Sequence, residues 1–287
     1  MKKLLAIDGN AYIHRAYHGM PKITREDGFP IGAITGVRNM TQELFRCFEP
    51  SHCIVVFDHR DGSFRNKLYP EYKATRKPSD EDLKKQYQPI YDLFKSLGIT
   101  TAIIPDYEAD DVLGSIANIA SSNGLYTMIA TGDKDMAQLV DEYTHLVSVS
   151  RGEPNVMDEM DVLDKFGVMP YQMIDYLTLV GDQADNVKGV YKCGPKTAVK
   201  WLLEYETLDN LILNKDEIKG AIGDRFRESL GWLPLSKNLV TIRTDVSLGI
   251  NLSEMSVLNI KERLSFIEEY YNLYELKGEA SKWLDLV

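Results

Sequence analysis

The first half of the chain alternates short runs of β-forming residues with amphipathic helical patterns. The β-forming runs cover residues 3–8, 52–58, 99–105, 126–131 and 144–150, and apolar residues at helical spacing cover 31–48 and 109–120. Strands that alternate with helices form βαβ units, in which each crossover returns the chain to the same end of the sheet. The alternation therefore predicts an α/β fold: a mainly parallel twisted sheet with helices on both faces.

The pattern changes after residue 157. Helical patterns dominate from there, at 158–166, 170–180, 194–205, 224–242 and 259–272. We therefore expect an α/β portion over residues 1–157 and a helical C-terminal portion over 158–287, packed as one body. Residues 60–90 fit neither portion, because they contain three prolines, few core-forming residues and six basic residues between 60 and 77. A connection of this length without a core face is usually functional.

Acidic residues gather where the predicted strands end. In an open parallel sheet, ligands bind beyond the carboxyl ends of the strands. Carboxylates directed at one crevice would repel each other unless cations were bound there, and oxygen donors without His or Cys partners suit Mg²⁺ or Mn²⁺. The nine acids that we interpret as metal ligands are Asp8, Asp58, Glu108, Asp110, Asp111, Asp133, Asp135, Asp182 and Asp185.

Each of these acids has a simpler interpretation when taken singly. An Asp that precedes a helix is a standard N-cap, and Asp111 just inside a helix also suits the helix dipole. The joint pattern favours metal binding, because YEADD (107–111) supplies three acids within four residues where a cap needs one. An aspartyl-phosphate mechanism does not fit, because its second Asp would stand where the chain has Asn10.

Residues 188–200, KGVYKCGPKTAVK, contain four lysines and no acid. Gly194 and Pro195 precede a helical pattern, and the free N–H groups at the start of that helix favour a phosphate. A solvated lysine face explains the same residues equally well when they are considered alone. Beside an acidic crevice and a second basic segment, binding of a nucleic-acid backbone is the better explanation.

The composition at first argues against a nucleic-acid partner. The chain of 287 residues has 33 basic and 43 acidic residues, a net charge of −10, whereas nucleic-acid binders of the uniformly basic kind are positive. Without the nine site acids the balance is only −1.

Four apolar residues before Asp8 are too few for a signal peptide or membrane helix, and three cysteines without a CxxC pair predict no disulfide framework. We therefore expect a cytoplasmic protein.

Seven motifs resemble the 5′-nuclease domain of bacterial DNA polymerase I and the wider flap endonuclease (5′-3′ exonuclease) family, in the stand-alone form without a polymerase. They are LLAIDGNAYIHRAYH, VVFD, FRNKLYPEYKATRKP, YEADD, TGDKDMAQLV, VGDQADNVKGV and GPKTA. The resemblance runs nearly end to end. It implies a PIN-like nuclease core, a helical arch or clamp over residues 60–90, and a helix–three-turn–helix DNA-binding hairpin at about 186–205.

The resemblance also implies a function. It is that of a structure-specific 5′ nuclease, a two-metal phosphodiesterase with Mg²⁺-dependent 5′-3′ exonuclease and flap endonuclease activity, whose products are a 5′-phosphate and a 3′-hydroxyl. Asp8, Asp58, Glu108 and Asp110 would surround the first Mg²⁺, for which Mn²⁺ can substitute, and the other five acids would surround or support the second. Lys73 and Arg76 would neutralise charge on the scissile phosphate. Primer removal, replication and repair are the implied roles, and cleavage of RNA in RNA–DNA hybrids is left open.

DNA with 5′ flaps, branches or nicks is the implied partner, and we expect a monomer that binds no membrane. The implied DNA contacts are Arg15, Arg65, Tyr72, Lys77, Lys188, Lys192, Gly194, Lys196, Thr197 and Lys200. Tyr72 has two interpretations, stacking on a base or packing within the arch.

The family often holds a K⁺ ion in its hairpin through backbone carbonyls, which here would be those of Gly189, Val190 and Cys193. The family usually has Pro-Gly and an aliphatic residue where this chain has Tyr191, Lys192 and Cys193. A lysine in place of glycine alters the turn if that position requires a positive φ.

Two other functions compete with this one. A DNA-binding relative that has lost catalysis would lack several of the carboxylates, and all nine are present. A single-strand ribonuclease of the related PIN-type fold would be much shorter and would lack both the arch segment and the hairpin.

Overall fold

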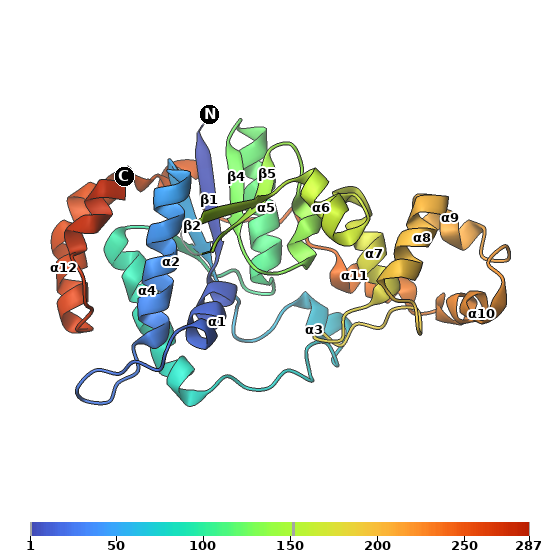
Figure 1. Ribbon diagram of the computed structural model, residues 1–287, viewed down its shortest axis with the longest axis horizontal. Helices are drawn as coiled ribbons and strands as arrows, with labels where there is room; N and C mark the ends of the chain where they lie inside the picture. The colour runs from blue at the N-terminus through green and yellow to red at the C-terminus, as the bar shows by residue number, and fades with distance from the viewer. Residues whose placement is uncertain (1, 151–152, 287) are drawn as a thin grey trace.

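A six-stranded sheet with the order β3-β2-β1-β4-β5-β6 forms the centre of the molecule (Figure 1). The computed structural model describes residues 2–150 and 153–286. The strands are β1 (Lys3–Asp8), β2 (His52–Val56), β3 (Thr100–Ala102), β4 (Tyr126–Ala130), β5 (Thr144–Ser150) and β6 (Glu153–Met157). The first five are parallel, and β6 runs antiparallel to β5. The predicted fold class is confirmed, although the sequence did not indicate β6.

The central strand β1 explains why the sheet is covered on both faces. Its residues 4–7 are all fully buried. Leu4 and Ala6 belong to one core cluster, which includes α5 (Ala109–Ser122), whereas Leu5 and Ile7 belong to a second cluster with α2 (Gly32–Phe48). Strands buried on both faces appear in a sequence as continuous apolar runs, which is the pattern of KLLAID.

The C-terminal portion is helical. Its α-helices are α6 (Glu159–Phe166), α7 (Met173–Val180), α8 (Pro195–Tyr205), α9 (Leu208–Leu213), α10 (Gly220–Ser229), α11 (Leu233–Val240) and α12 (Leu264–Leu273). The 3₁₀ helices of the chain are η1 (Asp135–Leu139), η2 (Pro170–Gln172), η3 (Leu252–Met255), η4 (Val257–Arg263) and η5 (Ala280–Leu286). Figure 1 shows α8, α9 and α10 at one end of the molecule and α12 at the other.

One expected helix, over 224–242, is in fact two. α10 ends at Ser229 and α11 begins at Leu233. Pro234 lies in the first turn of α11, where its missing N–H costs no hydrogen bond. Within residues 2–150 and 153–286, no helix is long and apolar enough to span a bilayer.

Residues 60–90 differ from the expected helical arch. Helix occurs only in the short α3 (Phe64–Leu68) and from the start of α4 (Glu81–Leu97), while residues 69–80, which we call the strap, contain turns and irregular backbone. α4 is a core helix despite Pro89 in its interior, because Ile90, Leu93 and Phe94 are buried.

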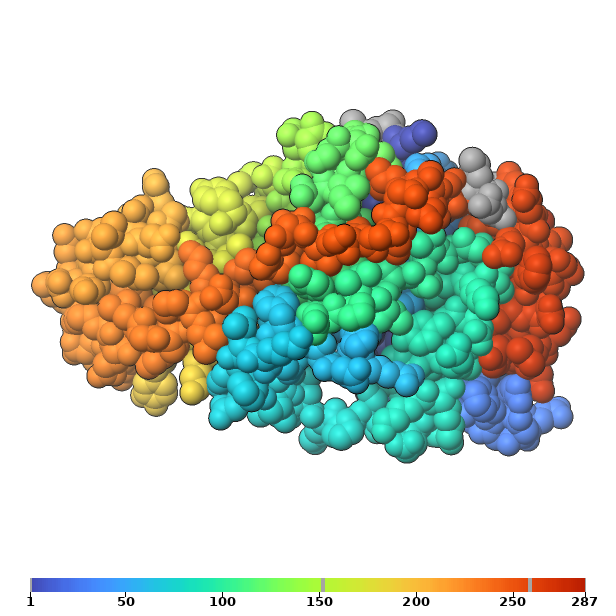
Figure 2. All heavy atoms as spheres, turned by 180° about the vertical axis from the view of Figure 1, so that it is seen from behind, coloured from blue at the N-terminus to red at the C-terminus, as the bar shows by residue number. Residues whose placement is uncertain are grey.

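The strap crosses from α3 to α4 below α1 (Figure 1). Seen from behind, the space-filling view shows a small opening through the molecule beside the cyan segment that contains the strap (Figure 2). The remaining helix, α1 (Gly9–Gly19), follows β1 directly.

Candidate functional site

The carboxyl edge of the sheet carries the first acids. Asp8 is the last residue of β1 and the N-cap of α1: its Oδ1 accepts a hydrogen bond from the Ala11 N–H at 2.9 Å. Its Oδ2 accepts one from the Thr131 hydroxyl at 2.9 Å. Asp58, just after β2, accepts hydrogen bonds from the Ala109 N–H at 2.8 Å and the Asn10 amide at 3.0 Å. The cap interpretation is therefore correct for Asp8, and it is compatible with a position at the site.

Four of the acids form one electrostatic group: Asp8, Asp58, Asp110 and Asp133. Burial, followed by the charges of Asp58 and Asp133, raises the pKa of Asp8 to about 6. Burial, followed by the charges of Asp8 and Asp133, raises the pKa of Asp110 well above its usual range. Repulsion of this kind is relieved by protons or by a bound cation.

A second group lies at the turn after β4 and the turn after α7. Asp182 accepts hydrogen bonds from the N–H groups of Ala184 and Asp185, at 2.7 and 3.2 Å, and forms an ion pair with Lys134 at 2.8 Å. Burial, followed by the charge of Asp133, raises the pKa of Asp135 to about 7. One oxygen of Asp135, Oδ1, is buried and has no hydrogen-bond partner.

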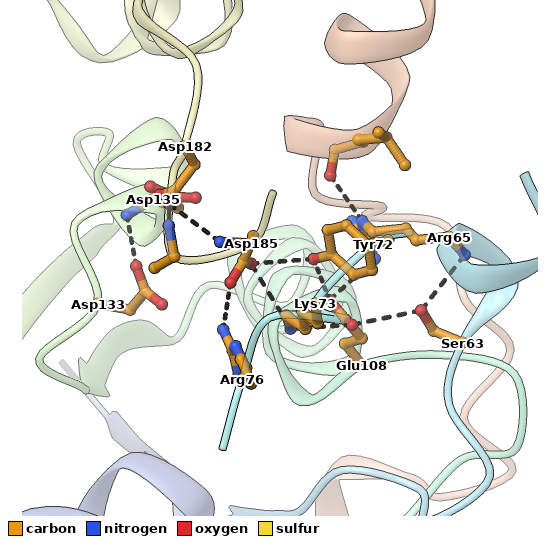
Figure 3. Close-up of polar contacts among 12 residues, drawn as sticks. Ser63, Arg65, Tyr72, Lys73, Arg76, Glu108, Asp133, Asp135, Asp182 and Asp185 are labelled. Atoms are coloured by element: carbon orange, nitrogen blue, oxygen red, sulfur yellow. Dashed lines mark hydrogen bonds and ion pairs between the residues drawn. The ribbon is translucent and has the colours of Figure 1, made fainter. Parts of the chain in front are cut away.

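The strap holds Glu108, at the start of α5, and Asp185, in the turn after α7 (Figure 3). Lys73 Nζ lies 2.9 Å from Glu108 Oε1 and 3.7 Å from Asp185 Oδ2. Arg76 pairs with the other oxygen of Asp185. The Tyr72 hydroxyl lies 3.0 Å from Glu108 and 3.1 Å from Asp185. The strap backbone is tied to the same turn, because the Lys73 N–H donates to the Asp185 carbonyl at 3.0 Å.

The donor set fits divalent metal ions. All donors are carboxylate oxygens, the preferred ligands of Mg²⁺ and Mn²⁺, and the buried Asp135 Oδ1 lacks the partner that a cation would supply. As the side chains stand, no three His, Cys, Asp or Glu residues in the described chain are arranged to hold an ion. Lys73, Arg76 and Lys134 hold the oxygens of Glu108, Asp182 and Asp185 instead.

Two predicted site residues have a different role in the structure. Asp111 is 0% exposed and Arg65 is 2% exposed, and they form a two-pronged ion pair with N–O distances of 2.6 and 2.8 Å. Asp111 also accepts hydrogen bonds from the N–H groups of Glu108 and Arg243. Asp111 therefore has no free oxygen for a metal, and no phosphate reaches Arg65. Arg65 lies in α3 and Asp111 in α5, so the pair links the two helices. Each buried charge is stable only beside the other.

Tyr72 is also placed differently from the base-stacking prediction. Its side chain is 4% exposed and belongs to the core cluster around α5. This burial favours the packing interpretation of Tyr72 over stacking on a base. Arg15 and Lys77 are exposed, as DNA contacts require, and Arg15 donates to the Val149 carbonyl at 3.2 Å.

The hairpin of α7, α8 and residues 181–194 presents its basic residues to solvent. Lys188, Lys192, Lys196 and Lys200 are all exposed, and none of them makes an ion pair within the described residues. Gly194 is the N-cap of α8, and its carbonyl accepts a hydrogen bond from the Thr197 N–H.

The turn of the hairpin places Lys192 in the left-handed region of backbone conformation. Lys192 adopts a φ of 61°, so a residue with a Cβ occupies a position that favours glycine, at a cost of about 1–2 kcal/mol. Gly189 allows close packing: a Cβ there would lie 2.4 Å from the Val180 carbonyl carbon.

The site contains three side chains that we did not predict from the sequence. Lys134 pairs with Asp182, Asn10 binds Asp58, and Thr131 binds Asp8. Lys134 lies between Asp133 and Asp135 in TGDKD, and this position could have predicted a lysine that pairs with the acids of the site. Nothing local marked Asn10 or Thr131, because each acts on a residue that another strand supplies.

Known proteins resemble the chain along almost its whole length. The family model of the 5′-3′ exonuclease N-terminal resolvase-like domain matches residues 3–167, and that of the 5′-3′ exonuclease C-terminal SAM fold matches 168–263. A 5′-3′ exonuclease of Aquifex aeolicus is 34% identical, with 93% of each chain covered. A DNA polymerase I of Pseudomonas aeruginosa is 37% identical over 98% of this chain, which spans only 31% of that protein.

A solved structure shares the fold. The flap endonuclease D15 of bacteriophage T5, in a pseudo-enzyme-product complex with DNA and metal ions, superposes with a TM-score of 0.68. The two chains are 18% identical, and each is covered to 99%.

Proposed function

Because this chain belongs to the 5′-3′ exonuclease family, we infer that it is a nuclease, and we propose that it hydrolyses DNA at 5′ flaps and 5′ ends with the help of two divalent metal ions. The products would be a 5′-phosphate and a 3′-hydroxyl. The observation that supports the proposal is the strap: Lys73 pairs with Glu108 and Arg76 pairs with Asp185, so two cations lie among the acids of the site.

The metal ligands that we propose are eight of the nine acids. Asp8, Asp58, Glu108 and Asp110 would hold one ion, and Asp133, Asp135, Asp182 and Asp185 would hold the other. Bound there, the ions would lower the pKa of the attacking water and stabilise negative charge on the phosphodiester. Mg²⁺ is the ion that we propose, and Mn²⁺ would replace it.

The chain's own cations would act on the scissile phosphate. In the structure Lys73 and Arg76 neutralise Glu108 and Asp185. If bound metal ions neutralised those acids, the ammonium and guanidinium groups would become available to the phosphate oxygens. Prearranged donors of this kind stabilise charge that develops in the transition state.

We propose that the substrate contacts two separate places. A 5′ single strand would pass through the opening beside the strap, and the duplex would lie on the hairpin lysines. The DNA complex of the T5 enzyme supports this choice of substrate. A K⁺ ion on the carbonyls of Gly189, Val190 and Cys193 stays a prediction, and the Gly189 and Val190 carbonyls each already accept one hydrogen bond. Cleavage of RNA in hybrids also stays a prediction.

A cleavage assay tests the function. Purified protein is mixed with a 5′-flap DNA and Mg²⁺, alongside EDTA and the Asp185→Ala variant. We expect release of the flap only by the wild type with Mg²⁺. Absence of cleavage, or equal rates for Asp185→Ala and wild type, would sink the proposal. Cleavage of RNA hairpins in preference to flap DNA would favour the PIN-type ribonuclease, and tight flap binding without turnover would favour a relative that has lost catalysis.

A further inference from the structure

An exposed tyrosine ring in the hairpin has two cations next to it. Tyr191 is 66% exposed, and its ring centroid lies 5.5 Å from Lys192 Nζ and 5.4 Å from the guanidinium carbon of Arg225. The electron-rich face of an aromatic ring attracts such cations. Neither cation makes an ion pair with any residue that the structure describes. The result is a local positive charge that no acid pairs with in the part of the chain that the structure describes.

Arg225 comes from α10, a different element from the hairpin. The next residue, Phe226, is fully buried and packs against Trp201 of α8, with ring centroids 5.3 Å apart. This contact fixes α10 against α8, the second helix of the hairpin. The neighbouring Arg227 is already engaged, because it pairs with Asp224 and donates to two backbone carbonyls. Arg225 is therefore the arginine of α10 that is available for a ligand.

The hairpin connects this cluster to the acidic site. Residues 186–190 lead directly from Asp185, and Trp232 Nε1 donates to the Gly189 carbonyl at 3.2 Å, which holds α11 against the same loop. A duplex that ends at the acids and lies on the hairpin would therefore continue toward Tyr191 and α10.

We propose that Tyr191, Lys192 and Arg225 form a further contact with duplex DNA, in which the ring holds both cations against phosphates of one strand. Unpaired cations beside an exposed aromatic ring match the charge and shape of a sugar-phosphate backbone. The inference rests on the proposed function and extends its duplex site from the hairpin lysines to α10. Neither Tyr191 nor Arg225 is among the DNA contacts implied by the family motifs.

Salt-dependent binding tests the contact. The dissociation constant of a 5′-flap DNA with a long duplex is measured by fluorescence anisotropy in EDTA over a range of KCl concentrations. Each phosphate contact contributes about 0.9 to the slope of log affinity against log salt. We expect Arg225→Gln to reduce the magnitude of that slope by about this amount, and to leave binding of a single-stranded oligonucleotide unchanged.

A matched control has the same chemistry at the far end of the molecule. Arg263 lies 5.0 Å from the Phe266 ring on the other side of the fold, so Arg263→Gln removes an equivalent cation from an equivalent ring. We expect wild-type binding from that variant. Tyr191→Phe keeps the ring and should bind as the wild type does, whereas Tyr191→Ala should lower the slope as Arg225→Gln does. Thermal unfolding of each variant shows that it is folded.

The outcomes separate the two proposals. If wild-type protein cleaves flap DNA and Arg225→Gln has the same slope as Arg263→Gln, the contact does not exist and the proposed function stands. If the wild type neither binds nor cleaves flap DNA, the proposed function itself fails.

Discussion

The strap and the hairpin are both basic, but the strap cations are paired with acids whereas the hairpin cations are not. Lys73 and Arg76 of the strap are paired with carboxylates of the site. Lys188 and Lys196 of the hairpin make no ion pair among the described residues and face solvent. The strap cations therefore serve as internal counter-ions that must exchange partners before they meet a phosphate, whereas the hairpin is ready to bind one. The difference separates a region suited to chemistry from a region suited to affinity.

The largest expected effect concerns the anchor of the strap. Arg65→Met leaves Asp111 as a buried carboxylate without its cation, which should destabilise the protein by about 3–5 kcal/mol. Urea unfolding followed by circular dichroism measures this loss. Lys67→Gln is the control on the same helix: its pair with Asp106 is exposed and is worth at most about 1 kcal/mol. Equal losses from the two variants would mean that the buried pair does not anchor the strap.

The next effect compares chemistry with affinity directly. Lys73→Ala should lower the single-turnover cleavage rate by about 10²–10³-fold, the usual cost of losing one transition-state donor. Lys196→Ala should weaken duplex binding and leave the rate at saturating enzyme near that of the wild type. Quench-flow kinetics under enzyme excess measures both. If both variants lose cleavage rate, or both lose only duplex binding, the contrast between strap and hairpin is wrong.

The acids should make metal-free protein sensitive to pH. Asp8 and Asp135 have folded-state pKa values of about 6 and about 7, above the ordinary value of 3.8. Between pH 4 and 7 these two acids therefore bind more protons in the folded chain than in the unfolded chain, so their contribution to stability in EDTA should fall as the pH rises through this range. Saturating Mg²⁺ should make the stability less dependent on pH over this range. Unfolding in urea at several pH values checks the sign, and a stability that rises over this range would contradict it.

A double substitution probes the same repulsion. Asp133→Asn with Asp135→Asn removes two charges from the site, so the melting temperature in EDTA should rise, by about 2–4 °C for each kcal/mol of repulsion relieved. Differential scanning calorimetry measures the change. With saturating Mg²⁺ the melting temperature of the variant should no longer exceed that of the wild type. A lower melting temperature in EDTA would show that these acids are structural caps.

The smallest effect is expected at Lys134. Its pair with Asp182 is half exposed on the lysine side, so Lys134→Gln should change stability in EDTA by about 1 kcal/mol or less. Because the lysine competes with a metal for Asp182, the variant should bind Mn²⁺ more tightly by isothermal titration calorimetry. Weaker Mn²⁺ binding would mean that Lys134 orients Asp182 for the ion and does not compete with it.

Local patterns predicted much of the molecule, because the period of apolar residues reports which faces are buried. The parallel sheet, the helices on both faces and the 5′-3′ exonuclease family are confirmed. The same reasoning did not predict α4, because its first ten residues belong to the segment 60–90, which fitted neither portion; the buried face of the helix outweighs the effect of Pro89. The division of the chain at residue 157 and the individual roles of the site residues stay predictions.

The sequence by itself determined that acids stand at the ends of strands and that basic residues fill two segments, because both facts are local. Only the tertiary structure decided which charge meets which. Asp111 and Asp110 are adjacent in YEADD, yet Asp111 is buried against Arg65 whereas Asp110 faces Asp8 and Asp133. Successive residues at the start of a helix point in different directions, so their partners come from segments far away in the chain. A sequence pattern records the type of a charge and its spacing, whereas its partner is fixed when the elements pack together.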